Sequence, residues 1–288
     1  MILKKEAFIA TIDSYNSKSL FSRIQRKLSY FHKQLFIAYL KKYGKVSILN
    51  TKIIFGDTMK IVLPDNISIA LYLVGFFEAE ESKAFSKLMQ PGYNFIDIGA
   101  HIGYYSVLAN YLGGENAKIV AIEPTPSTFK FLSENVQKFA NTMCFNIALY
   151  SKSGEMDFND FGVENMCLNS FFDARLDHKI KGEKVKVKVK TLDNIIEDFN
   201  IKPDLIKIDA ESAELEILKG AGKAFENKAT FFVEVGDYNL ENTNSSLKII
   251  EYFESKDYKA FEFKEDNFVI HVKKHEKYPS MSLYFLPN

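Results

Sequence analysis

Strand-like and helix-like segments alternate along the chain from Tyr93 onward, and this alternation constrains the fold more than any other feature. Short apolar runs of strand length are separated by stretches with helical spacing. This pattern predicts an α/β fold of βαβ units, in which helices pack on a parallel sheet. The expected strands are 94–98, 118–123, 143–149, 205–209 and 230–235, with helices at 104–111, 126–139, 192–199, 213–219 and 245–255. An antiparallel pair, 258–263 and 267–272, is expected to finish the sheet.

Pro91-Gly92 marks the expected boundary between a cap and the main domain. Residues 1–90 are expected to form the cap, with helices at 20–39, 67–73 and 79–88 and a small antiparallel element of strands 46–49, 52–55 and 60–63. Residues 91–288 are expected to form the main domain. An insertion at about 150–191 interrupts it and contains one polar-faced strand at 183–190.

The composition is that of an ordinary globular protein, with 47% hydrophobic and 26% charged residues. Cys144 and Cys167 show no metal-type spacing, and the five histidines show none either, so no metal site and a reducing, cytoplasmic location are expected. The longest mostly apolar run, 67–77, is too short to cross a bilayer.

Charge is distributed unevenly along a chain whose formal net charge is zero. Residues 1–50 contain ten Lys or Arg against two acids. Within the expected helix 20–39, an apolar stripe recurs at helical intervals, made of Leu20, Ile24, Leu28, Phe31, Leu35 and Tyr39. We expect this helix to pack on the main domain and to turn its basic face to solvent. Docking to anionic lipid or to an anionic acceptor is the alternative.

Acidic residues close four of the expected strands: Asp97, Glu123, Asp209 and Glu234. Parallel strands bind ligands at their carboxyl ends, so these side chains are expected to surround one crevice. Carboxylates favour a cationic ligand and repel phosphates. The pattern therefore indicates S-adenosylmethionine, a sulfonium attached to an adenosyl ribose, as the cofactor, and no nucleic acid is expected as a partner.

The strand-to-helix turn after Asp97 contains Gly99, His101 and Gly103. Glycine lets the backbone approach a ligand closely, but the spacing departs from the G-x-G-x-x-G fingerprint of dinucleotide sites. Glu123 follows Gly99 by 24 positions, where Rossmann-type sites place the acid that binds both ribose hydroxyls.

Other residues near these strand ends complete the expected cofactor site. Asn146 is expected to pair with the adenine edge, although asparagine at a strand end is also common in turns. Tyr104 is either an aromatic wall or part of the core. The remaining residues of the expected cofactor set are Ala100, Pro124, Ala148 and Asp209.

Three carboxylates are candidates for the base that deprotonates an acceptor hydroxyl: Asp209, Glu211 and Glu234. Asp209 or Ser212 is alternatively a cap for the following helix. Lys207 is expected to be structural. Residues that shape the acceptor pocket are expected around 169–175 and in the amino-terminal segment.

Five segments together carry a resemblance to a known family: FIDIGAHIGYYSVLA, VAIEPTPSTFKFLSENV, NIALYSKSGEMDF, TLDNII and LIKIDAESAELEILKGA. Over 75–236 the chain resembles the FkbM class of S-adenosylmethionine-dependent methyltransferases. The resemblance implies a Rossmann-like, seven-stranded sheet and methyl transfer to hydroxyls of glycans or secondary metabolites. It also adds Glu78 to the site.

Two positions depart from the pattern of this family: His101 stands where Asn is usual, and Ser212 stands where Gly is common. Two other functions remain open at this level. One is a non-catalytic binding module on a methyltransferase fold, and the other is an NAD-dependent oxidoreductase, which the glycine spacing disfavours. The oligomeric state is open.

Overall fold

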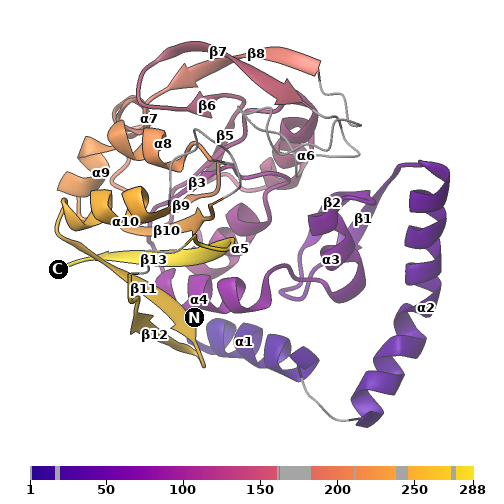
Figure 1. Ribbon diagram of the computed structural model, residues 1–288. Coiled ribbons are helices and arrows are strands. Elements are labelled where there is room, and N and C mark those ends of the chain that lie inside the picture. The colour runs from indigo at the N-terminus through magenta and orange to yellow at the C-terminus, as the bar shows by residue number, and fades with distance from the viewer. Residues whose placement is uncertain are drawn as a thin grey trace.

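The main sheet of the computed structural model is mixed, with strand order β12-β11-β13-β10-β9-β3-β4-β5 (Figure 1). The structure describes residues 2–16, 20–160, 162, 183–210, 212–237, 246–273 and 277–288. The strands are β3 (Phe95–Ile98), β4 (Ile119–Ile122), β5 (Thr142–Phe145), β9 (Leu205–Ile208), β10 (Thr230–Val235), β11 (Tyr258–Lys264), β12 (Asn267–Ile270) and β13 (Met281–Pro287).

Five neighbouring strands, β10, β9, β3, β4 and β5, run parallel, which confirms the expected α/β class. Among the described residues this sheet has eight strands, one more than the seven expected. The unexpected strand is β13, which pairs antiparallel with both β10 and β11 and therefore separates the β11–β12 pair from the parallel strands. The expected strand 143–149 is also wrong in extent, because the chain leaves the main sheet after Phe145.

Helices cover both faces of the main sheet, and the strand residues alternate between two apolar clusters (Figure 1). Phe95 packs in the cluster that includes α4 (Ala79–Leu88), α5 (Tyr104–Gly113) and α6 (Pro126–Val136). Its neighbour Ile96 packs in the cluster that includes α7 (Leu192–Asp198), α8 (Glu214–Lys219), α9 (Gly222–Glu226) and α10 (Ser246–Glu254). Because both faces are covered, the central strands are buried along their whole length.

The insertion forms a second sheet of β6 (Ala148–Leu149), β8 (Glu183–Lys190) and β7 (Gly154–Asp160), in that order. The strand expected at 183–190 is confirmed, and its apolar residues Val187 and Val189 pack on Phe158. The segment 169–175, where we expected residues that shape the acceptor pocket, lies outside the described residues, as does Cys167.

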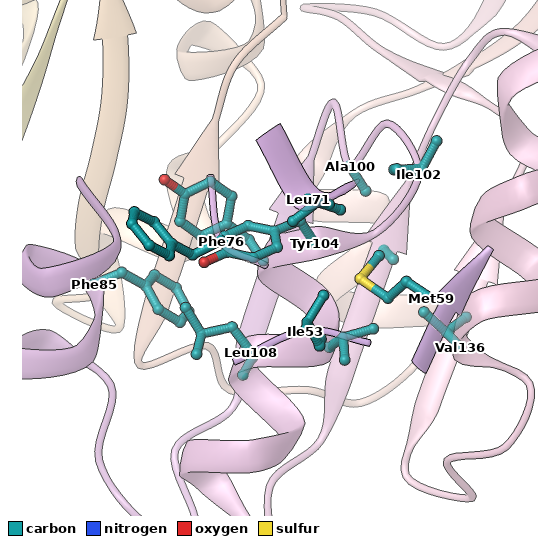
Figure 2. Close-up of a cluster of buried hydrophobic side chains, with 14 of the residues drawn as sticks. Ile53, Met59, Leu71, Phe76, Phe85, Ala100, Ile102, Tyr104, Leu108 and Val136 are labelled. Carbon is teal, nitrogen blue, oxygen red and sulfur yellow. The ribbon is translucent and has the colours of Figure 1, made fainter. Parts of the chain in front are cut away.

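The first ninety residues contain α1 (Ile2–Asn16), α2 (Leu20–Tyr43), β1 (Ser47–Lys52), β2 (Thr58–Leu63) and α3 (Asn66–Val74), followed by α4. We did not predict α1 from the sequence. We expected three strands here, and the structure has two. β1 continues through Asn50 and Thr51, where we expected a break, and pairs along its length with β2. Figure 2 shows that this region shares a core with α5, which covers one face of the main sheet, because Met59 and Leu71 lie in one cluster with Tyr104 and Leu108.

The helix expected at 20–39 is confirmed as α2, but its predicted stripe does not face the protein where the side chains are described. Phe31 and Leu35 are 60% and 55% exposed. The helix packs instead through Ile37 and Leu40, which are buried. Leu20, Ile24 and Leu28 have side chains outside the described part of the structure. Within the described ranges, no helix combines the length and hydrophobicity needed to cross a bilayer.

Candidate active site

The carboxyl ends of the parallel strands open into a cavity of about 230 Å³. Glu123, Asp209 and Glu234, which follow or end β4, β9 and β10, all line it, as the sequence predicted, and so does Glu78. Asp97 does not line this cavity. Asp97 is 1% exposed and accepts a hydrogen bond from Ser106 Oγ at 2.7 Å. It lines a smaller pocket, which shares Gly99, His101 and Asp209 with the main cavity.

The turn between β3 and α5 brings the backbone of two strands together at Gly99. Its N–H donates to the carbonyl of Ile122, and a Cβ at this position would lie 1.8 Å from the carbonyl oxygen of Asp209. The φ angle of +76° also favours glycine. Gly103 does not line the cavity, and a Cβ built at Gly103 would lie 2.8 Å from the Leu132 side chain. Gly99 and His101 therefore line the main cavity, whereas Ala100 and Tyr104 line only the smaller one.

Glu123 is a buried carboxylate that backbone groups hold in place. Oε2 accepts the N–H of His101 and Oε1 accepts the N–H of Thr125, both at 3.0 Å. Burial raises the pKa of Glu123, although these hydrogen bonds act in the opposite direction. Each oxygen keeps a second lone pair, so the carboxylate can accept further hydrogen bonds from a diol in the cavity.

Asn146 has a different position from the one expected. Its amide nitrogen donates to the carbonyls of Glu123 and Pro124, both at 2.9 Å, and it does not line the cavity. It therefore holds the loop that presents Glu123, and both hydrogens of its amide nitrogen are used there, so this nitrogen has none left for the adenine contact that we predicted. Pro124 and Ala148 do line the cavity, as expected.

Several lining residues had no signal in the sequence. Ile122, Leu149 and Phe158 form an apolar wall beside Glu123, and two of them belong to the small sheet. Asn66, Ile67 and Phe77 line the cavity from the cap. These residues are separated by many positions along the chain, so only the packed tertiary structure brings them to one cavity.

Lys207 is the largest difference from the sequence analysis, which treated it as structural. It is 4% exposed, and its Nζ lies 2.8 Å from Asp209 Oδ2 and 5.0 Å from the centre of the Tyr105 ring. Burial alone lowers the pKa of Lys207, but the charges of Asp209, Asp97 and Glu78 outweigh it and raise the pKa. The acidic crevice therefore contains a buried cation and is less anionic than its four strand-end acids suggest.

Asp209 and Glu234 form a carboxyl pair at adjacent strand ends. Burial raises the pKa of Asp209, but Lys207 and a hydrogen bond from Glu234 hold it below its usual value. The charge of Asp209, together with burial, raises the pKa of Glu234 to about 9. At neutral pH Glu234 is therefore protonated and donates to an ionised Asp209, and Glu234 Oε1 accepts from Ser280 at 2.5 Å.

Glu78 precedes α4 and enters the same cavity from the cap. Burial raises the pKa of Glu78 to about 7, against the lowering effect of Lys207 and of the Tyr105 hydroxyl. That hydroxyl donates to Glu78 Oε2 at 2.9 Å. Glu78 is therefore the carboxylate of this cluster that exchanges its proton near neutral pH.

Glu211, the remaining candidate base, lies outside the described residues. Its neighbour Ser212 has a φ of +81°, a conformation that favours glycine, and His101 has a φ of +52°. Both departures from the family pattern therefore fall at left-handed positions. In the part of the chain that the structure describes, no three His, Cys, Asp or Glu side chains are placed to hold a metal ion.

Comparison with known proteins agrees with this geometry. Residues 97–260, more than half of the chain, match the family model described as the methyltransferase FkbM domain. The match begins at Asp97, includes Glu123, Asp209 and Glu234, and ends within β11.

Two curated relatives have named activities. The hexuronic acid methyltransferase AglP of Haloferax volcanii is 29% identical over 142 residues, which are 48% of this chain and 54% of the relative. The methyltransferase sdnD of Sordaria araneosa is 28% identical over 155 residues, which are 43% of this chain and 59% of that protein. The chain thus spans little more than half the length of these relatives.

Solved structures give weaker matches. A precorrin-6y C5,15-methyltransferase from Geobacter metallireducens is 16% identical, with a TM-score of 0.40, over 73% of this chain and 89% of that one. Pyrococcus horikoshii TYW2 in complex with MeSAdo is 17% identical, with a TM-score of 0.42, over 84% and 72%. These scores are low, and the family assignment rests on the family model.

Proposed function

The chain belongs to the FkbM methyltransferase family, and from that premise we propose that it transfers a methyl group from S-adenosylmethionine to a hydroxyl oxygen of a glycan. The glycan acceptor is supported by the relative named as a hexuronic acid methyltransferase. A hydroxyl of a secondary metabolite is the alternative acceptor.

The cavity fits an adenosyl group at the end where Glu123 lies. Glu123 presents acceptor lone pairs for the two ribose hydroxyls, and Ile122, Pro124 and Phe158 give apolar contacts for a purine ring. Gly99 keeps the floor of the cavity free of a side chain, because a Cβ there would collide with the backbone of Asp209. These residues would hold the nucleoside and orient it.

S-adenosylmethionine supplies a methyl group on a positively charged sulfur when it is bound. The residues at the other end of the cavity, Asp209, Glu234 and Glu78, would surround the reacting groups. Asp209 is ionised and favours positive charge nearby, whereas the protonated Glu234 donates its one hydrogen bond to Asp209. The main contribution of the protein is to position the acceptor oxygen in line with the methyl group and to exclude water.

We assign the general base to Glu78 instead of Asp209, Glu211 or Glu234, the three candidates from the sequence. A base works best when its pKa lies near the working pH. The pKa of Glu78 is about 7, whereas Glu234 keeps its proton and Asp209 is paired with Lys207. Glu78 would take the proton from the acceptor hydroxyl as the oxygen attacks.

The observation that carries this proposal is that one cavity contains both the backbone-held Glu123 and the poised Glu78. Isothermal titration of the purified chain with S-adenosylhomocysteine tests the cofactor half. We expect binding of this product and no binding of NAD⁺. Binding of NAD⁺ without S-adenosylhomocysteine would refute the proposal.

Mass spectrometry of glycan acceptors tests the reaction half, with uronic acid glycosides compared with neutral hexosides and with small hydroxylated metabolites. We expect a gain of one methylene on a glycan. In Glu78→Gln, we expect kcat to fall by about 10²- to 10⁴-fold, while S-adenosylhomocysteine still binds. Glu115→Gln, at an exposed position outside the cavity, is the control.

The variant Tyr105→Phe tests whether the Glu78 carboxylate acts as the base or has only a structural role. Loss of the Tyr105 hydroxyl removes a hydrogen bond that favours ionised Glu78. We therefore expect the rising limb of the pH–rate profile, near pH 7 in the wild type, to move to higher pH. An unshifted profile would remove Glu78 from the base role without affecting the cofactor assignment.

A further inference from the structure

The outward side of α2 carries a row of large apolar and aromatic side chains. Phe31, Leu35, Tyr39 and Tyr43 follow one another at intervals of four residues and are 60%, 55%, 44% and 57% exposed. Helical residues four apart lie on one face. We call this surface, with the two lysines beside it, the α2 outer face, and it consists of Phe31, Leu35, Tyr39, Lys42, Tyr43 and Lys45.

The lysines of the α2 outer face lie against its aromatic rings. Lys45 Nζ is 2.9 Å from the Tyr39 hydroxyl, and Lys42 Nζ lies 5.4 Å from the centre of the Tyr43 ring. The rings of Tyr39 and Tyr43 are 4.9 Å apart. Tyrosine and lysine, each with an apolar body and a polar tip, suit the boundary between apolar and aqueous phases.

The opposite side of α2 is anchored to the protein. The row is therefore exposed on a helix that is packed in place and not on a detached one. Ile37 and Leu40 are buried, and Lys33 Nζ donates to the carbonyl of Tyr72 in α3 at 2.6 Å. Figure 1 shows α2 along the outer edge of the molecule, beside α3. The α2 outer face is therefore presented on a supported helix.

The stretch of sequence that contains α2 carries charge of one sign. Between Asp13 and Asp57 the sequence has nine Lys or Arg and no Asp or Glu. A helix with large apolar residues on one face and basic residues beside them is the pattern that binds the interface of anionic bilayers.

We propose that the α2 outer face docks on a lipid bilayer containing anionic lipid, with α2 parallel to the membrane plane. Phe31 and Leu35 enter the boundary between headgroups and acyl chains, while Lys42 and Lys45 meet lipid phosphates. α3, which packs on α2, begins with Asn66 and Ile67, and both line the candidate active site. Docking therefore places a wall of the cavity close to the membrane surface.

Charge favours a membrane over a second copy of the chain as the occupant of this surface. Two copies joined through the α2 outer face would each bring a basic segment to the contact, because the sequence has no Asp or Glu between Asp13 and Asp57. That segment of the partner would offer no carboxylate to Lys42 and Lys45, whereas anionic lipid neutralises them.

Flotation of the full chain with vesicles tests the proposal. We expect the protein to float with vesicles of phosphatidylcholine mixed with phosphatidylglycerol, to remain unbound with pure phosphatidylcholine, and to dissociate as salt is raised. Phe31→Ser with Leu35→Ser should weaken binding about tenfold or more. Lys42→Glu with Lys45→Glu should weaken it at least about twentyfold.

Matched variants on other surfaces control for general loss of charge or apolar area. Lys186→Glu with Lys188→Glu changes two exposed lysines of β8, and Ile270→Ser with Val272→Ser removes side chains that are 65% and 76% exposed. Both controls should bind as the wild type does. Circular dichroism melts would show that all variants fold.

Three results would overturn the proposal. The first is equal flotation of wild type and α2 variants, and the second is no flotation with anionic vesicles. The third is a dimer, measured by light scattering, that Phe31→Ser with Leu35→Ser dissociates while vesicle binding is unchanged. The third result would assign the surface to a second copy of the chain.

Discussion

At one end of the cavity Glu123 accepts hydrogen bonds from backbone N–H groups of His101 and Thr125, whereas at the other end Asp209 meets the side chains of Lys207 and Glu234. The first end is built from residues 97–125 and the walls beside them. The second end combines the cap with β9 and β10. Backbone donors stay in place when a neighbouring side chain changes, but a network of side-chain charges depends on every member.

This difference also separates the proposed tasks of the two ends. A carboxylate held by backbone groups is preorganised to accept ribose hydroxyls without changing its protonation. The group of Glu78, Asp209, Glu234 and Lys207 holds protons at different pKa values and is suited to moving one of them. Mutations at the two ends should therefore fail in different ways.

The largest expected effect is at Lys207. In Lys207→Met, three carboxylates lose their buried counter-ion, so we expect the free energy of unfolding to fall by about 3–5 kcal/mol. Urea unfolding measures this change. Lys190→Met, which breaks the half-exposed pair with Asp198, should cost less than about 1 kcal/mol. Equal effects of the two variants would contradict the central role of Lys207.

Gly99→Ala tests the backbone construction of the cofactor end. Its Cβ would lie 1.8 Å from the Asp209 carbonyl, so the β3 turn must move, and we expect a loss of about 2–3 kcal/mol and weaker binding of S-adenosylhomocysteine. Gly92→Ala has nearly the same φ, +77°, with no atom within 4 Å of its Cβ. It should cost only about 1 kcal/mol, which isolates the collision from the backbone strain. Similar losses would show that the close approach does not matter.

The sequence predicted part of the cofactor end for a physical reason. Gly99 and Glu123 follow two buried strands, and the period of the apolar pattern together with the turn residues identifies such positions, whereas Asp97 faces the smaller pocket. The same reasoning placed Asp209 and Glu234 at one crevice. It missed Lys207, because a lysine within a buried strand gives no sign of which carboxylates surround it.

Tertiary packing set the remaining features. The strand β13 sits between β10 and β11, and no local pattern specifies that an edge pair will be separated by a later strand. The apolar stripe of α2 was expected to be buried, but periodicity identifies a face and not what covers it. In the sequence His101 and Ser212 are departures from the family pattern, and only the backbone angles show that both residues are left-handed.

Glu123→Gln tests the ribose contact. The amide nitrogen would face the N–H of His101 or Thr125, donor against donor, and would lose an acceptor for the cofactor. Hydrogen bonds to a charged group contribute about 1.5–3 kcal/mol, so we expect about 10- to 100-fold weaker binding of S-adenosylhomocysteine by titration calorimetry. Glu155→Gln, at an exposed position of β7, is the control. Unchanged affinity would place the ribose elsewhere.

At pH 5, where wild-type Glu234 is protonated, the Glu234 variant is expected to have the smallest effect of the four, and its difference from the wild type appears as pH rises. The pKa of Glu234 is raised from 4.5 to about 9 in the folded protein, so between these values the folded state binds more protons than the unfolded state. Stability from this group is fully present below pH 4.5 and is lost as pH rises through about 9, with a slope of at most about 1.4 kcal/mol per pH unit.

Glu234→Gln keeps a donor for Asp209 and an acceptor for Ser280 but cannot titrate. Between about pH 5 and about pH 9 the melting temperature should therefore fall less steeply with pH in the variant than in the wild type. The stability of the variant relative to the wild type then grows with pH. Parallel curves would mean that Glu234 is ionised at neutral pH, in which case Glu234 would again compete with Glu78 for the role of base.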